Sequence, residues 1–171
     1  MRNKRMLVAI VFVATVLLVT GTGSAADIRG TISTTLVITE DSQLVGDVTC
    51  TVTGAPCIAF GASGIALKLN GFTLTGLANP VTACAGSNNT TLESGIEVSN
   101  QRGAVIQGPG VVQRFRSSGI RLNASTRVLV TLLTASTNCM AGIWVIAGSD
   151  NEIVNNTFSR NGNVTLPCGG I

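Results

Sequence analysis

A short pattern, glycine and isoleucine followed by two further residues, occurs three times in the second half of the chain. It stands at Gly95–Val98, Gly119–Leu122 and Gly142–Val145. Its isoleucines, Ile96, Ile120 and Ile143, lie 24 and then 23 residues apart. A fixed period of this length is typical of repeat architectures, in which each unit buries its apolar face only against its neighbours. The chain is therefore expected to be a stack of similar units.

Short apolar runs within each repeat predict strands rather than helices. Three runs alternate apolar and polar residues, and turn-forming glycine, asparagine, serine and aspartate separate them. The second run is assigned to Val105, Val128/Val130 and Ile153, and the third to Val111, Leu133 and Phe158. Leucine-rich repeats would show a Leu-x-x-Leu-x-Leu pattern, which is missing, and a propeller blade needs about 40 residues. We therefore expect an all-β chain that winds as a parallel β-helix.

The first 26 residues carry the features of a secretory signal peptide. Arg2, Lys4 and Arg5 precede an uncharged apolar run over residues 6–20, and small residues lead up to Ala26. The run is short for a membrane-spanning helix, which needs about 20 apolar residues. We predict cleavage after Ala26 and a secreted or periplasmic protein without a membrane anchor; an uncleaved anchor is the alternative. Residues 27–171 then form one domain of roughly six coils.

Removal of this peptide also removes the net charge. The sequence has 11 basic and 8 acidic residues, and three of the basic ones lie in the peptide, so eight of each sign remain. A neutral chain gives no general reason to bind nucleic acid or an anionic membrane. We therefore expect neither as a partner.

Five cysteines follow the peptide, and an exported chain permits disulfides between them. Cys139 lies four residues before Ile143 and Cys168 three before Ile171, which places both at the same turn of successive coils. We therefore predict a Cys139–Cys168 disulfide, and a second one in which Cys50 and Cys57 close a short loop. Histidine and Cys-x-x-Cys spacings are missing from the sequence, so we expect no metal site and no cofactor.

Two stretches resemble a known superfamily. They comprise Asp47–Cys50, Ile58 and Ile65–Gly76 in the first case, and Ser149–Phe158 in the second. The first resembles the opening of right-handed parallel β-helix repeat proteins of the pectate-lyase-like superfamily. The second resembles the repeat unit of their copper-maturation and carbohydrate-binding members. The resemblance spans about residues 47–171 and implies a right-handed, single-stranded parallel β-helix, but no particular reaction, because one scaffold hosts many functions.

Three local features bear on how the coil is built. Asn70-Gly71 is expected to form a sharp corner with glycine at positive φ, rather than a hairpin. Asn155 and Asn156 are expected to stack as corner asparagines on neighbouring coils. Residues 77–93 form an insertion, and such loops often border the binding face of a β-helix. A solvated loop without a partner is the alternative.

The outward-facing residues between the repeated apolar positions form the best candidate site. Glu97, Arg121 and Trp144 occupy the same position in three successive repeats, which stacks them about 4.8 Å apart on one face. An indole beside an arginine and a carboxylate suits a sugar ring, which can stack on the indole while its hydroxyls bond the charged groups. The alternative is a structural Glu97–Arg121 pair worth about 0.2–1 kcal/mol beside an ordinary exposed tryptophan.

The acidic residues do not form a recognisable catalytic set. Only Glu40/Asp41 and Asp150/Glu152 are close in sequence, so we assign neither the calcium site of a lyase nor the paired carboxylates of a hydrolase. We therefore predict a secreted, non-catalytic surface or carbohydrate-contacting module with polysaccharide as its partner. The alternative is a truncated remnant of a polysaccharide lyase or glycoside hydrolase. A copper-delivery role ranks third, because histidine is absent and residues 27–171 contain one methionine, Met140.

The last residues, Cys168–Ile171, open a further repeat after which the sequence stops. A solenoid needs a polar cap, because its last strands otherwise remain unpaired. We expect either truncation, with C-terminal coils missing, or end-to-end self-association through the uncapped coil. Truncation is favoured because nothing in the last coil is of a protective kind.

Overall fold

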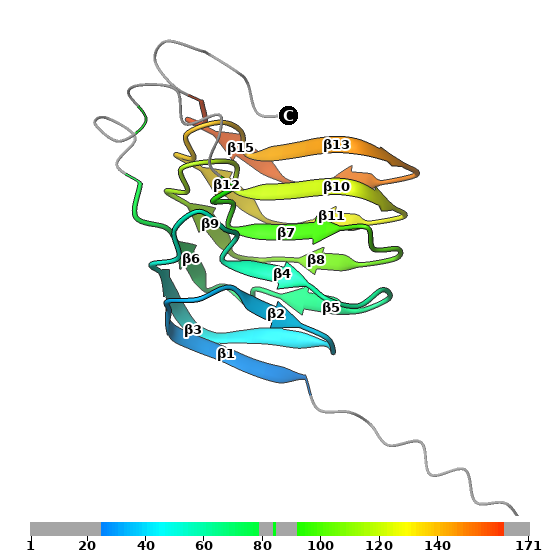
Figure 1. The fold of residues 1–171 in the computed structure, drawn as a ribbon, viewed down its shortest axis with the longest axis horizontal. Coiled ribbons are helices and arrows are strands. Elements are labelled where there is room, and N and C mark those ends of the chain that lie inside the picture. The colour runs from blue at the N-terminus through cyan, green and yellow to red at the C-terminus, as the bar shows by residue number, and fades with distance from the viewer. Residues whose placement is uncertain (1–24, 79–83, 85–91, 163–171) are drawn as a thin grey trace, which may run out of the picture.

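The computed structural model describes residues 25–78, 84 and 92–162, and within them the chain forms strands and turns without a helix (Figure 1). Every strand pairing is parallel. The larger sheet, sheet A, begins with β1 (Ala26–Ile32) and β3 (Ser42–Cys50) and then divides into two arms. One arm consists of β5 (Ala66–Lys68), β8 (Val105–Gln107), β11 (Leu129–Thr131) and β14 (Glu152–Val154). The other consists of β6 (Thr73–Thr75), β9 (Val111–Gln113), β12 (Thr134–Ser136) and β15 (Thr157–Ser159).

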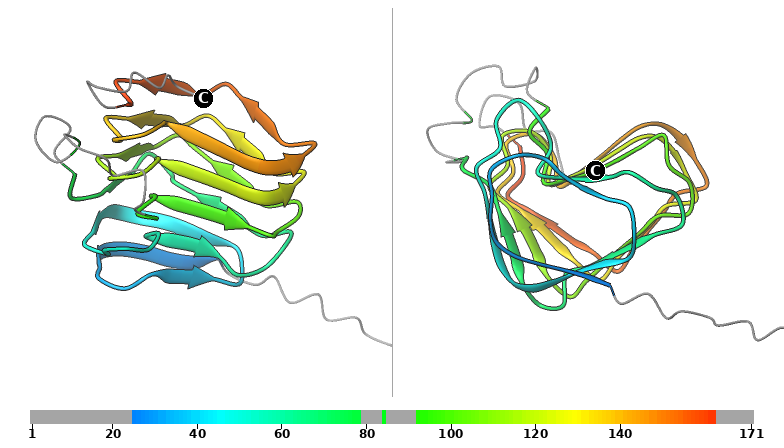
Figure 2. Two further views of the ribbon diagram at one scale, coloured as in Figure 1. Left: turned by 45° about the horizontal axis from the view of Figure 1, so that its top comes forward. Right: turned by 60° about the horizontal axis from the view of Figure 1, so that its bottom comes forward.

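The smaller sheet, sheet B, forms the third wall. It contains β2 (Leu36–Ile38), β4 (Ile58–Phe60), β7 (Ile96–Ser99), β10 (Ile120–Thr126) and β13 (Ile143–Ser149). The chain adds one strand to each wall per turn, so neighbours in a sheet come from successive coils, which overlie one another in Figure 2. The predicted right-handed parallel β-helix of about six coils is confirmed.

Apolar side chains of successive coils stack in rows inside the three walls. In sheet B the register aligns Ile58, Ile96, Ile120 and Ile143, and each is fully buried. Burial of one such side chain contributes about 1.5–3 kcal/mol. Because a strand of three residues cannot bury its own side chains, each coil depends on the coils above and below it.

Two apolar positions are shifted by one residue from the prediction. Val105 and Val111 face outward, and the inward residues of β8 and β9 are Ile106 and Val112. Leu133 is buried, but it precedes β12, whose inward residue is Ala135. Val105-Ile106 and Val111-Val112 are both pairs of apolar residues, so alternation alone does not decide which member points inward.

Residues with positive φ mark the corners between the walls. The predicted corner at Asn70-Gly71 is confirmed, with φ of 50° and 87°. Corners recur at matching places in later coils, at Arg127, Leu132 and Thr137 and, 23 residues on, at Asp150, Asn155 and Arg160. The prediction that Asn155 stacks inward is wrong, because it is one of these exposed corner residues.

An asparagine after a corner bonds the coil below it. The Asn156 Oδ1 accepts from the Leu133 N–H at 3.1 Å, and its Nδ2 donates to the Val130 carbonyl at 2.8 Å. Asn151 and Asn161 make the same pair of bonds to their own neighbours. The predicted asparagine stacking is therefore confirmed for Asn156. These bonds supply partners to backbone groups that the sheets leave unpaired at the corners.

Two disulfides join turns on one side of the coil. The predicted Cys50–Cys57 bond is confirmed. The predicted Cys139–Cys168 bond is wrong, because Cys139 is bonded to Cys84, in the insertion. The prediction considered only equivalent turns of successive coils, whereas the insertion brings a cysteine 55 residues away to the same corner. Cys168 lies outside the described residues.

Other expectations concern parts of the chain outside the described residues. These parts include residues 1–24 of the predicted signal peptide and the repeat that opens at Cys168. Ala26, the residue before the predicted mature chain, is the first residue of β1. In the described part of the chain, no helix has the length and hydrophobicity needed to cross a membrane.

The inward asparagines should be essential to stability. In Asn138→Ala the Phe115 N–H and the Val112 carbonyl lose their side-chain partners, now at 3.0 and 3.2 Å. Because a buried polar group without a partner costs about 1–3 kcal/mol, we expect a loss of roughly 2–4 kcal/mol in urea unfolding. Asn123→Ala, at an outward position, is the matched control and should change stability by less than about 0.5 kcal/mol. Equal losses in the two variants would contradict this role.

Candidate functional site

The outer face of sheet B carries the predicted ladder of side chains. Glu97 of β7 pairs in register with Arg121 of β10, and Arg121 pairs with Trp144 of β13. Alternation along each strand sends the flanking isoleucines inward and these three residues outward. The predicted stacking of Glu97, Arg121 and Trp144 on one face is therefore present.

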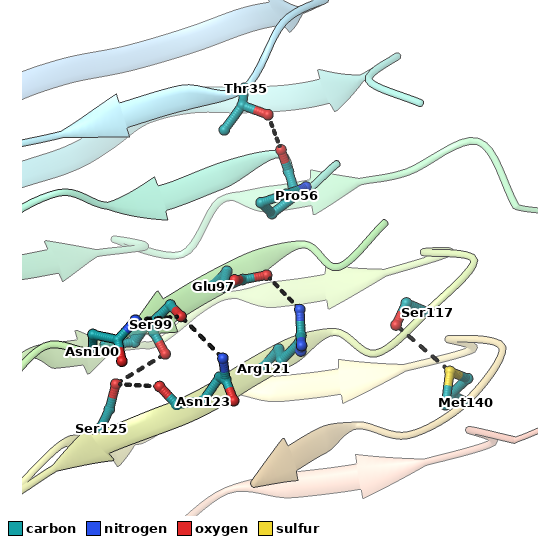
Figure 3. Close-up of polar contacts among 11 residues, drawn as sticks. Thr35, Pro56, Glu97, Ser99, Asn100, Ser117, Arg121, Asn123, Ser125 and Met140 are labelled. Carbon is teal, nitrogen blue, oxygen red and sulfur yellow. Dashed lines mark hydrogen bonds and ion pairs between the residues drawn. The ribbon is translucent and has the colours of Figure 1, made fainter. Parts of the chain in front are cut away.

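Arg121 makes specific contacts with both neighbours. Its Nη1 donates to Glu97 Oε2 at 3.1 Å, as Figure 3 shows, and each of the two side chains is only 14% exposed. The guanidinium carbon lies 5.8 Å from the centroid of the Trp144 ring, within the range of a cation–π contact. Trp144 itself is 36% exposed. The ladder thus consists of a largely buried ion pair that supports an exposed aromatic ring.

This geometry assigns different tasks to the three residues. The Arg121 guanidinium is engaged by Glu97 and Trp144, and its buried Nε has no partner. Arg121 is consequently placed to orient Trp144 rather than to reach out to a ligand. The exposed part of the indole is the surface on which a ligand can stack, and a direct sugar contact by Arg121 stays a prediction.

A second polar row lies beside the ladder. Ser99 of β7 pairs in register with Asn123 of β10, and the Asn123 Nδ2 donates to the Ser99 Oγ at 3.1 Å (Figure 3). Both residues are half-buried and face outward. The sequence analysis did not include them, although the same alternation that identified Glu97 and Arg121 extends to the residues two places further on.

A buried ion pair at another corner was also missed. Arg116 binds both carboxylate oxygens of Glu93, and the Gly54 N–H donates to Glu93 Oε1 at 2.7 Å. Glu93 is 7% exposed. Its carboxylate therefore ties the end of the insertion to the loop that Cys50 and Cys57 close. A carboxylate and an arginine 23 residues apart, one repeat length, were the available sequence signal.

A cavity of about 20 Å³ lies next to this ion pair. Its walls include the Cys50–Cys57 disulfide, Glu93, Ser94 and Arg116. The Ser94 Oγ is buried and has no hydrogen-bond partner. A space of this size accommodates about one water molecule.

The described residues offer few metal ligands. They contain no group of three or more histidine, cysteine, aspartate or glutamate side chains placed to share an ion. Cys50, Cys57, Cys84 and Cys139 are all in disulfides. The Met140 sulfur accepts a hydrogen bond from the Ser117 Oγ at 3.6 Å (Figure 3).

Comparison with known proteins identifies one family. A family model described as "Periplasmic copper-binding protein (NosD)" matches residues 28–168. The match includes nearly all the described coils, the sheet B ladder and both disulfides. No curated protein and no solved structure matches the chain.

The Glu93 contacts should stabilise the coil measurably. Glu93→Ala removes the partner of Arg116 and of the Gly54 N–H, and we expect a loss of about 2 kcal/mol in urea unfolding. The value is below that of a fully buried pair, because the Arg116 side chain is 35% exposed. Glu152→Ala, an exposed carboxylate on β14, is the control and should be close to wild type. A Glu93→Ala chain as stable as this control would contradict the anchoring role.

Proposed function

Because this chain belongs to the family of periplasmic copper-binding proteins (NosD), we propose that its own role is that of a non-catalytic, carbohydrate-contacting module. The chain is a β-helix protein of the periplasmic or secreted compartment. The observation that carries the proposal is the exposed Trp144 ring, which Arg121 and Glu97 hold on the outer face of sheet B.

Copper does not fit the described residues in their disulfide-bonded form. Copper ions are bound in proteins mainly by imidazole, thiolate and thioether groups. The 171-residue sequence has no histidine, the four described cysteines are oxidised, and Met140 stands alone among the described residues. The binding function in the family's description therefore has no counterpart here that could support the proposed role.

A sugar polymer suits this face because of its combination of groups. Ligand sites commonly pair an aromatic surface with a few oriented polar groups. The exposed indole offers the aromatic surface, while Ser99 and Asn123 offer a hydroxyl and an amide in the adjacent row. These polar groups can exchange their mutual hydrogen bond for bonds to sugar hydroxyls.

The balance of charge on this face favours an uncharged polymer. The positive charge of Arg121 is matched by Glu97 at 3.1 Å, and both side chains are largely buried. An acidic sugar would therefore meet no available cation within the ladder. Since the ladder runs across neighbouring coils, its flat surface is better suited to an extended chain than to a compact molecule.

Binding can be measured through Trp144, which is the only tryptophan in the sequence. We expect soluble neutral polysaccharides to change its fluorescence and acidic ones to have a weaker effect. Trp144→Ala should weaken binding at least about tenfold in calorimetry, since aromatic contacts contribute on the order of 1–2 kcal/mol. Trp144→Phe should retain part of the affinity. Unchanged affinity in Trp144→Ala, or release of new reducing ends from the polymer, would contradict the proposal.

Glu97 should affect the site through Arg121. In Glu97→Gln the charge that holds the guanidinium is lost, so we expect red-shifted Trp144 emission and about threefold to tenfold weaker binding. Glu152→Gln removes a carboxylate from a different wall and is the matched control. Wild-type emission and affinity in Glu97→Gln would show that the ion pair does not position the indole.

A further inference from the structure

We propose that Cys50 and Cys57, once their disulfide is reduced, form a binding site for a Cu(I) ion. Copper binding by this chain would then depend on its redox state, being absent from the oxidised form and present in the dithiol form. The site is separate from the Trp144 ladder, and the inference does not rest on carbohydrate binding.

The backbone holds the two cysteines together independently of their sulfur–sulfur bond. Their Cα atoms lie 6.0 Å apart. Cys50 ends β3 and pairs with Ile32 of β1. The Cys57 N–H donates to the Ser94 carbonyl at 2.9 Å, and its carbonyl accepts from the Leu36 N–H at 2.9 Å. Because both residues belong to the coil ladder, reduction should leave the two sulfurs facing each other.

The loop between the cysteines is also held by other contacts. The Gly54 N–H donates to Glu93, and the Thr35 hydroxyl donates to the Pro56 carbonyl at 2.7 Å, a bond shown in Figure 3. The Thr51 N–H donates to the Ile32 carbonyl at 2.8 Å. A dithiol that is ordered before it meets the metal avoids part of the entropic cost of binding.

Space and chemistry next to the sulfurs suit a small soft cation. The 20 Å³ cavity borders both cysteines, so an ion can enter without displacing core side chains. Cu(I) prefers thiolate ligands to oxygen ligands. Glu93 is neutralised by Arg116, so this wall carries no net negative charge that would oppose loss of the thiol protons. The buried Ser94 Oγ, which lacks a partner, lines the same cavity.

The chemistry requires a reductant, which we identify by class as a dithiol. The dithiol gives up two electrons and two protons and becomes a disulfide, while the Cys50–Cys57 bond breaks and two thiols form. Cu(I) then replaces the two thiol protons, which pass to the solvent, and the metal remains in the +1 state. Two coordinate bonds from sulfur to copper result.

The test uses the exported chain carrying Cys168→Ser, so that the four thiols of interest are the only ones. Oxidised protein and protein reduced with dithiothreitol, then freed of reductant without air, are titrated with Cu(I) against the chromophoric chelator bicinchoninate. We expect no copper uptake by the oxidised form. The reduced form should take up one equivalent, which C84S/C139S retains and C50S/C57S binds at least about 100-fold more weakly.

Three outcomes would overturn the proposal: copper uptake by the oxidised form, no uptake by the reduced form, or uptake that C84S/C139S loses. Circular dichroism and Trp144 emission establish that each variant is folded. A second measurement avoids cysteine pair variants altogether. Cu(I) should protect Cys50 and Cys57 of the reduced protein from alkylation, mapped by mass spectrometry, and leave Cys84 and Cys139 reactive; the opposite pattern would also overturn the proposal.

Discussion

The structure depends on one constraint, that no coil can bury its own apolar side chains. Strands of three to nine residues place one row of side chains inside, and only the adjacent coils cover it. The Ile58–Ile96–Ile120–Ile143 row is buried for this reason. The same register that aligns the inner row also aligns the outer one. Glu97, Arg121 and Trp144 are therefore brought together as a consequence of core packing.

The corners meet a different physical requirement. The chain must turn sharply between walls, and there the sheet hydrogen bonds stop, so backbone groups lose their partners. Residues at positive φ make the turn, and the asparagine that follows supplies both a donor and an acceptor to the coil below. Asn156 illustrates why asparagine suits this place: its amide satisfies an N–H and a carbonyl at once.

Sequence reasoning succeeded where one residue type marked one face, and it failed where that mark was missing. The repeated isoleucines fixed the register of sheet B and hence the position of Trp144. In Val111-Val112 both residues are apolar, so the inward one became apparent only in three dimensions. The Cys84–Cys139 bond joins the insertion to the coil. The period describes only the coil, so it could not predict how an insertion returns to it.

Both disulfides lie at corners rather than in the core rows that define the fold, and this placement separates folding from metal chemistry. A bond between residues that strands already hold in register adds little to their geometry. Cys50 and Cys57 keep their backbone partners in β1, β2 and the Ser94 turn whether or not the sulfurs are joined. The oxidation state of this pair can therefore change which ions the protein accepts while the coil, and with it the Trp144 face, stays as it is. In a family described by copper binding, a histidine-free member can in this way retain an affinity that its oxidised structure conceals.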